Sequence, residues 1–147
     1  ATVDAVGAAR TGIRLSPGGT FWGVEESDVP ELYALLLAEL ARLEPAYVHL
    51  EGTADEEVLV ALRRAWPGTL IMNPSLPMSP KQVERADADR WLGLGADLIS
   101  FGRAYLSNPD LVERLRIGAP IAPADEATYF QGGDTGYLTY AAFQHAA

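Results

Sequence analysis

The sequence has no cysteine, only two histidines, and fewer basic side chains (11 Lys and Arg) than acidic ones (20 Asp and Glu). Without cysteine there is no disulfide framework, no thiol nucleophile and no thiolate metal ligand. The net charge of −9 argues against binding to nucleic acid or to an anionic membrane, because phosphate groups need a basic surface. We therefore expect no nucleic-acid partner, no membrane partner and no metal site.

Long apolar runs are also lacking. No segment approaches the length of a membrane span, and residues 1–20 contain no charged-then-apolar leader, so we expect a cytoplasmic protein. The length of 147 residues, with 48% hydrophobic and 21% charged residues, suits one globular domain over residues 1–147. The segment 119–147, rich in Gly, Ala and Pro, is predicted to be an irregular tail.

What the sequence does contain is an alternation of short apolar runs and helical patterns. Predicted strands are 11–15, 46–50, 69–72 and 96–101, and predicted helices are 28–43, 54–66, 79–94 and 109–116, after a helix end at 2–9. This order predicts parallel β/α units whose strands are buried on both faces. Two architectures remain open: a small doubly wound sheet, and half of a (β/α)₈ barrel.

Polar residues predict where these helices begin. Asp28, Ser79 and Asn108 are expected N-caps, the last two with a proline at the first helical position. In the first helix an apolar face is expected from leucines at helical spacing. Its members are Leu32, Leu35, Leu36, Leu40 and Leu43.

The run from Ala96 to Ile121 is the most informative stretch. Gly102 and Arg103 follow its strand directly, and a glycine, exposed helix-start amides and an arginine together form a suitable frame for an anion. An ordinary strand-to-helix turn with a solvated arginine explains the same residues, and one Gly-Arg pair is a weak signal. Three of the four strand ends are polar and two carry an arginine, Arg14 and Arg103, which favours an anionic ligand.

Five segments together resemble the Old Yellow Enzyme family of flavin-dependent ene-reductases. They are GIRLSP, YVHLEG, GTLIMNP, ADLISFGRAYLSNPDLVERLRIGAPI and ATYFQGGDTGYLTY, and they span about Val3 to Tyr140. The resemblance implies an α/β fold, a (β/α)₄ half of a TIM barrel made of strands five to eight of the (β/α)₈ barrel. It also implies FMN as cofactor, NAD(P)H as reductant of the complete enzyme, and a small alkene as substrate.

The resemblance assigns roles to individual residues. Arg14 matches the arginine that contacts the flavin ring near its N1–O2 edge, although a strand-end arginine in a salt bridge is the plainer alternative. Gly102 and Arg103 match the phosphate-binding Gly-Arg pair. Phe130 matches the tail aromatic beside the flavin and substrate, and Phe21 matches the loop that borders the substrate pocket, or is a core aromatic.

Departures from the family pattern limit what the chain is expected to do. Pro74 and Ser75 stand where the family has a glycine-containing pair whose amides bind phosphate. Proline has no N–H, so at least one phosphate contact is expected to be missing, with the Ser75 hydroxyl as its substitute. The family's substrate-binding donors and proton donor lie on the first half of the barrel, so no catalytic residue is expected in this chain. His49 is predicted to be a satisfied core histidine, His145 a surface residue, and Asp134 a turn residue.

A half-barrel has two open sheet edges, and its apolar inner face is expected to be exposed. We therefore expect self-association or pairing with a separate N-terminal half-barrel chain, and the abrupt start at Ala1 favours a fragment or a split product. Two functions stay open: the FMN-binding portion of an NAD(P)H oxidoreductase that reduces α,β-unsaturated carbonyls, inactive when alone, or a non-catalytic half-barrel module or partner subunit.

Overall fold

The computed structural model describes residues 1–75, 82–131 and 133–144. The chain forms two compact units, residues 1–79 with 88–100 and residues 80–87 with 101–147. The first contains α1 (Thr2–Val6), η1 (Ala8–Arg10), β1 (Gly12–Leu15), η2 (Phe21–Gly23), α2 (Val29–Ala41), β2 (Tyr47–Glu51), α3 (Glu56–Ala65), β3 (Leu70–Asn73), most of α4 (Arg85–Gly93), and β4 (Leu98–Ile99). The second contains α5 (Arg103–Ser107), α6 (Leu111–Ile117) and η3 (Glu126–Thr128).

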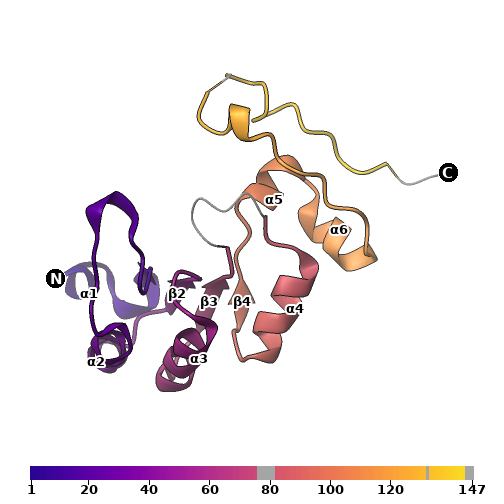
Figure 1. Cartoon of the computed structure of the whole chain (residues 1–147). Helices are drawn as coiled ribbons and strands as arrows, with labels where there is room; N and C mark the ends of the chain where they lie inside the picture. Colours follow the sequence, from indigo (N-terminus) through magenta and orange to yellow (C-terminus); the bar gives the residue numbers. More distant parts are fainter. Residues whose placement is uncertain (76–81, 132, 145–147) are drawn as a thin grey trace. The chain divides into compact units, whose positions relative to one another are not determined.

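The first unit is built on one sheet of four parallel strands in the order β1-β2-β3-β4 (Figure 1). Strands that are consecutive in the chain are hydrogen-bonded neighbours in the sheet, as in a β/α barrel. Residues of α2, α3 and α4 share one core with the strands. The strand order and the single helical layer of the described residues favour the half-barrel over the doubly wound sheet.

Alternation along the strands decides which residues enter that core. Val48 and Leu50 on β2 and Leu70 and Met72 on β3 are at most 1% exposed, and their neighbours along each strand are more accessible. Successive side chains of a strand point to opposite faces, so these four lie on the face covered by helices. The helices and adjoining loops complete the core with Tyr33, Leu37, Leu59, Leu62, Trp66, Trp91 and Ala96.

The opposite face of the sheet, here called the open face, is not fully covered by the described residues, which corrects the prediction of strands buried on both faces. Its side chains are half-buried or exposed, and β4 is only two residues long with Leu98 54% exposed. Tyr47 lies on this face above Gly12, its partner in the register. A Cβ on Gly12 would overlap the Tyr47 ring, so the glycine leaves room for the aromatic ring of the next strand.

The predicted apolar face of α2 is confirmed only in part, because Leu36 and Leu40 pack against the core but the other three predicted leucines do not. Tyr33 and Leu37 are buried, whereas Leu32, Leu35 and Leu43 are 47%, 65% and 50% exposed. Asp28 is at the N-cap position as expected, but its backbone is left-handed (φ 54°) and its side chain makes no capping hydrogen bond. The helix is therefore oriented by burial of Tyr33 and Leu37 and leaves three leucines on the surface.

Arg63 joins the end of α3 to the segment that leads into β4. Its guanidinium donates to the carbonyl oxygens of Gly95 (2.6 Å), Trp66 (3.1 Å) and Gly68 (3.0 Å). Asp97, which lies 3.4 Å from the same guanidinium, accepts a hydrogen bond from the Leu70 amide at 2.8 Å. One arginine thus satisfies three carbonyls that no helix or strand uses.

The second unit begins where β4 has ended. α5 follows Gly102, and α6 begins at Leu111 with Asp110 as N-cap, so Asn108 is not the cap that was predicted. Asn108 is fully buried instead, and its side chain donates to the carbonyls of Ala104 and Ala122 and accepts from the Ala122 amide. It therefore holds α5 against the start of the tail.

Three predictions lie wholly or partly outside the described residues. The N-cap Ser79 and His145 fall there, while α4 is helical from Arg85, later than predicted. Asp134 is confirmed as a turn residue, because its carbonyl accepts from the amides of Tyr137 and Leu138.

Leu37→Ala should destabilise the first unit by about 2–5 kcal/mol, because it leaves a cavity beside the sheet. Leu35→Ala, on the exposed side of the same helix, should change the stability by less than about 0.5 kcal/mol. Urea unfolding at sub-micromolar concentration, followed by the fluorescence of the buried Trp66 and Trp91, measures both. Equal losses in the two variants would contradict the assigned core face.

Candidate functional site

The carboxyl end of the open face carries a connected set of polar side chains. Arg14 on β1 donates to Glu51 on β2 (Nη2 to Oε1, 2.9 Å) and lies 3.4 Å from His49 (Nη1 to Nε2). His49 Nε2 is also 3.0 Å from the Ser100 hydroxyl, which follows β4. The Arg14 side chain is 47% exposed, so this guanidinium remains accessible from the open side of the sheet.

His49 is satisfied by hydrogen bonds, as predicted, but it does not lie in the core. Its register partner is Arg14, and it is half-buried on the open face. Desolvation lowers the pKa of His49, the positive charge of Arg14 lowers this pKa further, and the carboxylate of Glu51 acts in the opposite direction. The imidazole is therefore held in its neutral form to a lower pH than in an unfolded chain.

The loop between β1 and α2 is fixed at its base and exposed at its tip. Glu26 accepts from the Gly18 amide (2.7 Å) and from the Tyr33 hydroxyl (2.8 Å), and burial together with this hydrogen bond raises the pKa of Tyr33. At the tip, Phe21 is partly buried and Trp22 is 98% exposed with a left-handed backbone (φ 62°). Phe21 is thus placed on the loop that follows β1, and it is not a core aromatic.

The exit of β3 is arranged differently from a phosphate-binding turn. The Ser75 amide donates to the Asn73 side-chain oxygen at 3.1 Å, closing a local turn around Pro74. Pro74 has no N–H to donate. At this position Pro74 therefore supplies no backbone donor, and the backbone donor of Ser75 is engaged in the local turn.

Gly102, Arg103 and the tail aromatics belong to the second unit. Gly102 is exposed, and a Cβ built on it would have no described atom within 4 Å, so space is open at the start of α5. The charge of Arg103 acts on the hydroxyl of Tyr129, whose pKa is nevertheless raised because desolvation is the larger effect. Tyr129 packs edge-on against Phe130 at a centroid distance of 6.3 Å, and Phe130 is fully exposed.

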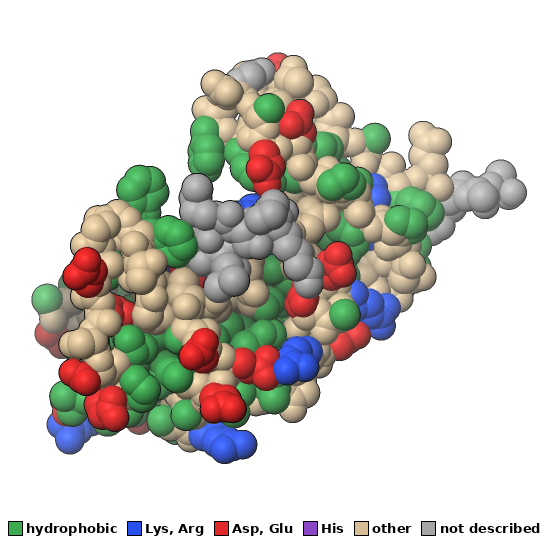
Figure 2. Space-filling view, viewed as in Figure 1, with side chains coloured by type: hydrophobic (Ala, Val, Ile, Leu, Met, Phe, Trp, Pro, Cys, Tyr) green, Lys and Arg blue, Asp and Glu red, His purple; other side chains and the backbone are tan. Residues whose placement is uncertain are grey.

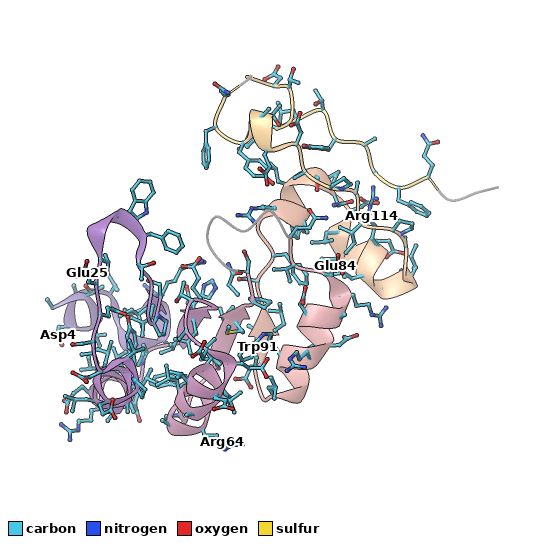
Figure 3. The ribbon with its side chains drawn as sticks, viewed as in Figure 1. Asp4, Glu25, Arg64, Glu84, Trp91 and Arg114 are labelled. Carbon is cyan, nitrogen blue, oxygen red and sulfur yellow. The ribbon has the colours of Figure 1, made fainter. Side chains whose placement is uncertain are left out.

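The tail that carries these aromatics is anchored by Arg114 of α6 (Figure 3). This buried guanidinium donates to Asp110 (2.8 Å), to the Pro120 carbonyl (2.9 Å) and to the Ala141 carbonyl (3.1 Å). It also lies 5.6 Å from the centre of the Phe143 ring. Although burial raises the pKa of Asp110, the hydrogen bonds from Arg114 and the Phe143 amide outweigh this effect and lower it.

The predicted site residues therefore fall into two groups, one in each unit. Arg14, Ser75 and Phe21 lie on loops or strand ends of the first unit, and Gly102, Arg103 and Phe130 lie in the second. Sequence reasoning missed the polar neighbours of Arg14, namely His49, Glu51 and Ser100. The period-two pattern of YVHLE places His49 and Glu51 on the face opposite Val48 and Leu50, and this signal identifies them once the core face is known.

Within the described parts of the chain, no group of three or more His, Cys, Asp or Glu side chains is arranged to hold a metal ion. Over the same residues, no helix is both long enough and apolar enough to cross a membrane.

Comparisons with known proteins identify relatives of this arrangement, although no family model matches the sequence. Chanoclavine-I aldehyde reductase of Penicillium roqueforti is 36% identical over 156 residues, covering 96% of this chain and 40% of the relative. The structure of morphinone reductase in complex with tetrahydroNAD is similar with a TM-score of 0.79 and 32% identity, over 97% of this chain and 38% of that protein. The old yellow enzyme from Trypanosoma cruzi gives a TM-score of 0.81 at 28% identity, over 97% and 37%.

The chain is a partial homologue of the Old Yellow Enzyme family. It is related to flavin oxidoreductases of the ene-reductase type, and its four parallel strands match part of the Old Yellow Enzyme barrel, as the sequence predicted. The chain spans about two fifths of the length of these Old Yellow Enzyme relatives. The roles assigned to individual residues stay predictions.

Arg114→Ala should release the tail of this Old Yellow Enzyme homologue, because two carbonyls lose a charged donor. Amide exchange in residues 138–144 should accelerate on the order of tenfold to a hundredfold, as expected for hydrogen bonds to a charged group. Arg116→Ala in the same helix removes only an exposed ion pair with Glu113 and should leave that exchange unchanged. Hydrogen exchange with mass spectrometry compares the two; similar acceleration in both would contradict the anchoring role.

Proposed function

We propose that this chain is the FMN-binding portion of an NAD(P)H oxidoreductase that reduces activated C=C bonds of α,β-unsaturated carbonyls. The observation that carries the proposal is the accessible guanidinium of Arg14 at the carboxyl end of a half-barrel homologous to Old Yellow Enzyme. In β/α barrels this end of the strands is where ligands bind. The similarity to a morphinone reductase structure with tetrahydroNAD supports a nicotinamide as the reductant.

The residues present fit FMN in part. Arg103, at the start of α5 beside an open Gly102, offers a planar fork of donors suited to a phosphate dianion. Arg14 offers a second positive charge at the strand ends of the first unit. Pro74 supplies no donor, and the Ser75 amide is engaged with Asn73, so only the Ser75 hydroxyl is proposed to add a contact there.

The proposed roles follow from charge and exposure. Bound FMN would supply the hydride chemistry, receiving hydride from NAD(P)H and delivering it to the β-carbon of the alkene. Arg14 would stabilise the negative charge of the reduced ring, while Glu51 holds its guanidinium in place. The exposed ring of Phe130 and the loop that carries Phe21 would border the flavin and the substrate and exclude water. The donors for the substrate carbonyl would come from the rest of the complete protein.

A non-catalytic half-barrel module or partner subunit is the second candidate function. It is favoured by the exit of β3, where Pro74 and the engaged Ser75 amide weaken the phosphate site. The two candidates differ in flavin content: an FMN-binding portion gives a yellow protein when combined with the remainder of the barrel, and a non-catalytic module stays colourless.

FMN binding tests the first candidate quantitatively. Supplied with the missing part of the barrel, the chain should lose FMN affinity on the order of tenfold to a hundredfold upon Arg103→Ala, because a charge-assisted contact is worth about 1.5–3 kcal/mol. Arg116→Ala, on the exposed side of α6, should leave the affinity unchanged. Arg14→Ala should lower the flavin reduction potential more than it loosens the phosphate.

The chain alone should bind FMN weakly, because it holds only part of the contacts. Flavin fluorescence during titration of FMN into the isolated chain measures this. Sub-micromolar binding by the chain alone would overturn the proposal that it is a partial site.

We also propose that the first unit associates, either with a second copy or with a separate N-terminal half-barrel chain. Hydrophobic and acidic side chains share the visible surface (Figure 2). Leu32 and Leu35 are exposed on α2, Leu43 is exposed just after this helix, and Leu98 is exposed on the edge strand β4. A hollow of ≈ 460 Å³ beside β1 is lined by residues that include Ile13, Leu40 and Leu43, a surface suited to an apolar partner.

Light scattering at micromolar concentration should therefore show a dimer or larger species. Leu35→Asp should shift the population toward monomer, because it places a charge in the exposed apolar surface. Val112→Asp, which changes a side chain of equal exposure (65%) on α6, should have no such effect. A clean monomer of the unmodified chain would contradict the association.

A further inference from the structure

The contacts of His49 favour one tautomer of its ring. A guanidinium has donors only, so the 3.4 Å contact between Arg14 Nη1 and His49 Nε2 is a hydrogen bond only when Nε2 accepts. The Ser100 hydroxyl, 3.0 Å from the same nitrogen, is able to donate to it. Both neighbours can donate to the ring only when it is the neutral imidazole with its hydrogen on Nδ1, and they then share the single lone pair of Nε2.

Protonation of the His49 ring makes its interaction with Arg14 repulsive. An Nε2–H can donate to Ser100 but not to Arg14, and two positive charges then face each other across the 3.4 Å contact. Glu51, on the other side of the guanidinium at 2.9 Å, attracts both charges. Protonation of His49 therefore removes one of the two contacts that fix Arg14 and adds repulsion in its place.

The charged surroundings of His49 are simple. Arg14 on β1 and Glu51 on its own strand are the charges that act on it. The open face also carries Ile71 and Asn73 from β3, Leu98 from β4, and Ser100, which follows β4; none of these side chains titrates. The helices cover the opposite face, where the buried side chains lie.

We propose that neutral His49 and Glu51 are positioning residues for Arg14, holding its guanidinium at the carboxyl end of the sheet, and that protonation of His49 releases it. The functional meaning rests on the proposed function, in which Arg14 faces the flavin ring. Glu51 fixes one nitrogen of the fork and His49 the other, and Ser100 orients the imidazole. The orientation of Arg14 is thus set by three strands, β1, β2 and the end of β4.

The test uses the chain alone, without flavin, because only His49 and His145 give histidine signals. His145→Gln identifies the second set of ring resonances. NMR of the His49 ring nitrogens above its pKa should show the Nδ1–H tautomer, and the signals of the Arg14 side chain should titrate together with His49. An Nε2–H tautomer, or an Arg14 that ignores the titration, would overturn the proposal.

Variants give the second part of the test. Arg14→Gln should raise the pKa of His49, Arg14→Lys should restore part of the lowering because the charge returns without the fork, and Glu51→Gln should lower the pKa further. Arg42→Gln removes an exposed arginine paired with Glu39 on α2 and should leave the His49 titration unchanged. An unchanged His49 pKa in Arg14→Gln or in Glu51→Gln would overturn the role of the substituted residue. If a variant fails to fold, the tautomer of His49 in the unmodified chain still tests the proposal.

The sign of the pH effect on stability follows from the lowered pKa. The unfolded chain binds a proton at His49 near pH 6.5 and the folded chain only at a lower pH, so stability is complete above about 6.5 and falls as the pH decreases through the folded pKa. His49→Gln should remove this pH-dependent part of the stability.

The two proposals fail separately. If FMN does not bind but His49 titrates as predicted here, the proposed function alone is contradicted. If the His49 pKa does not respond to the Arg14 and Glu51 variants, the positioning role alone is contradicted.

Discussion

The alternation of side chains along β2 and β3 is the constraint on which the first unit depends. Four residues of these strands enter the helical core, and every second residue is thereby sent to the other face. A shift of register by one residue would exchange the two sets and bury His49 and Glu51 without water. The burial of Val48, Leu50, Leu70 and Met72 therefore also determines where the polar groups of the candidate site stand.

On that open face, the positive charge of Arg14 is paired with nearby side chains. Arg14 is an accessible cation, but its nearest partners are a carboxylate and a neutral imidazole. The salt-bridge interpretation of Arg14 and the flavin interpretation are therefore compatible, since the pair with Glu51 orients the guanidinium and leaves half of it exposed. Arg114 in the second unit shows the contrasting case, in which a buried guanidinium donates to Asp110 and to two carbonyls and holds the chain.

The sequence was sufficient for the order and type of the main elements, because strong local signals mark them. GIRL, YVHLE and LIMN are strands close to their predicted bounds, and α3 buries the predicted Leu59 and Leu62. The misses arise where tertiary contacts override local patterns. Asn108 has the composition of a cap but finds better partners in Ala104 and Ala122, and the leucines of α2 outnumber the positions that the core can bury. His49 was misplaced because a short apolar strand does not reveal which faces are covered.

The packing of Tyr47 over Gly12 couples two positions that lie 35 residues apart in the sequence. A methyl group at position 12 would overlap the Tyr47 ring, so this ring would have to move. The effects of substitutions at the two positions are therefore expected to be non-additive: a larger residue at 12 fits better when position 47 carries a small side chain.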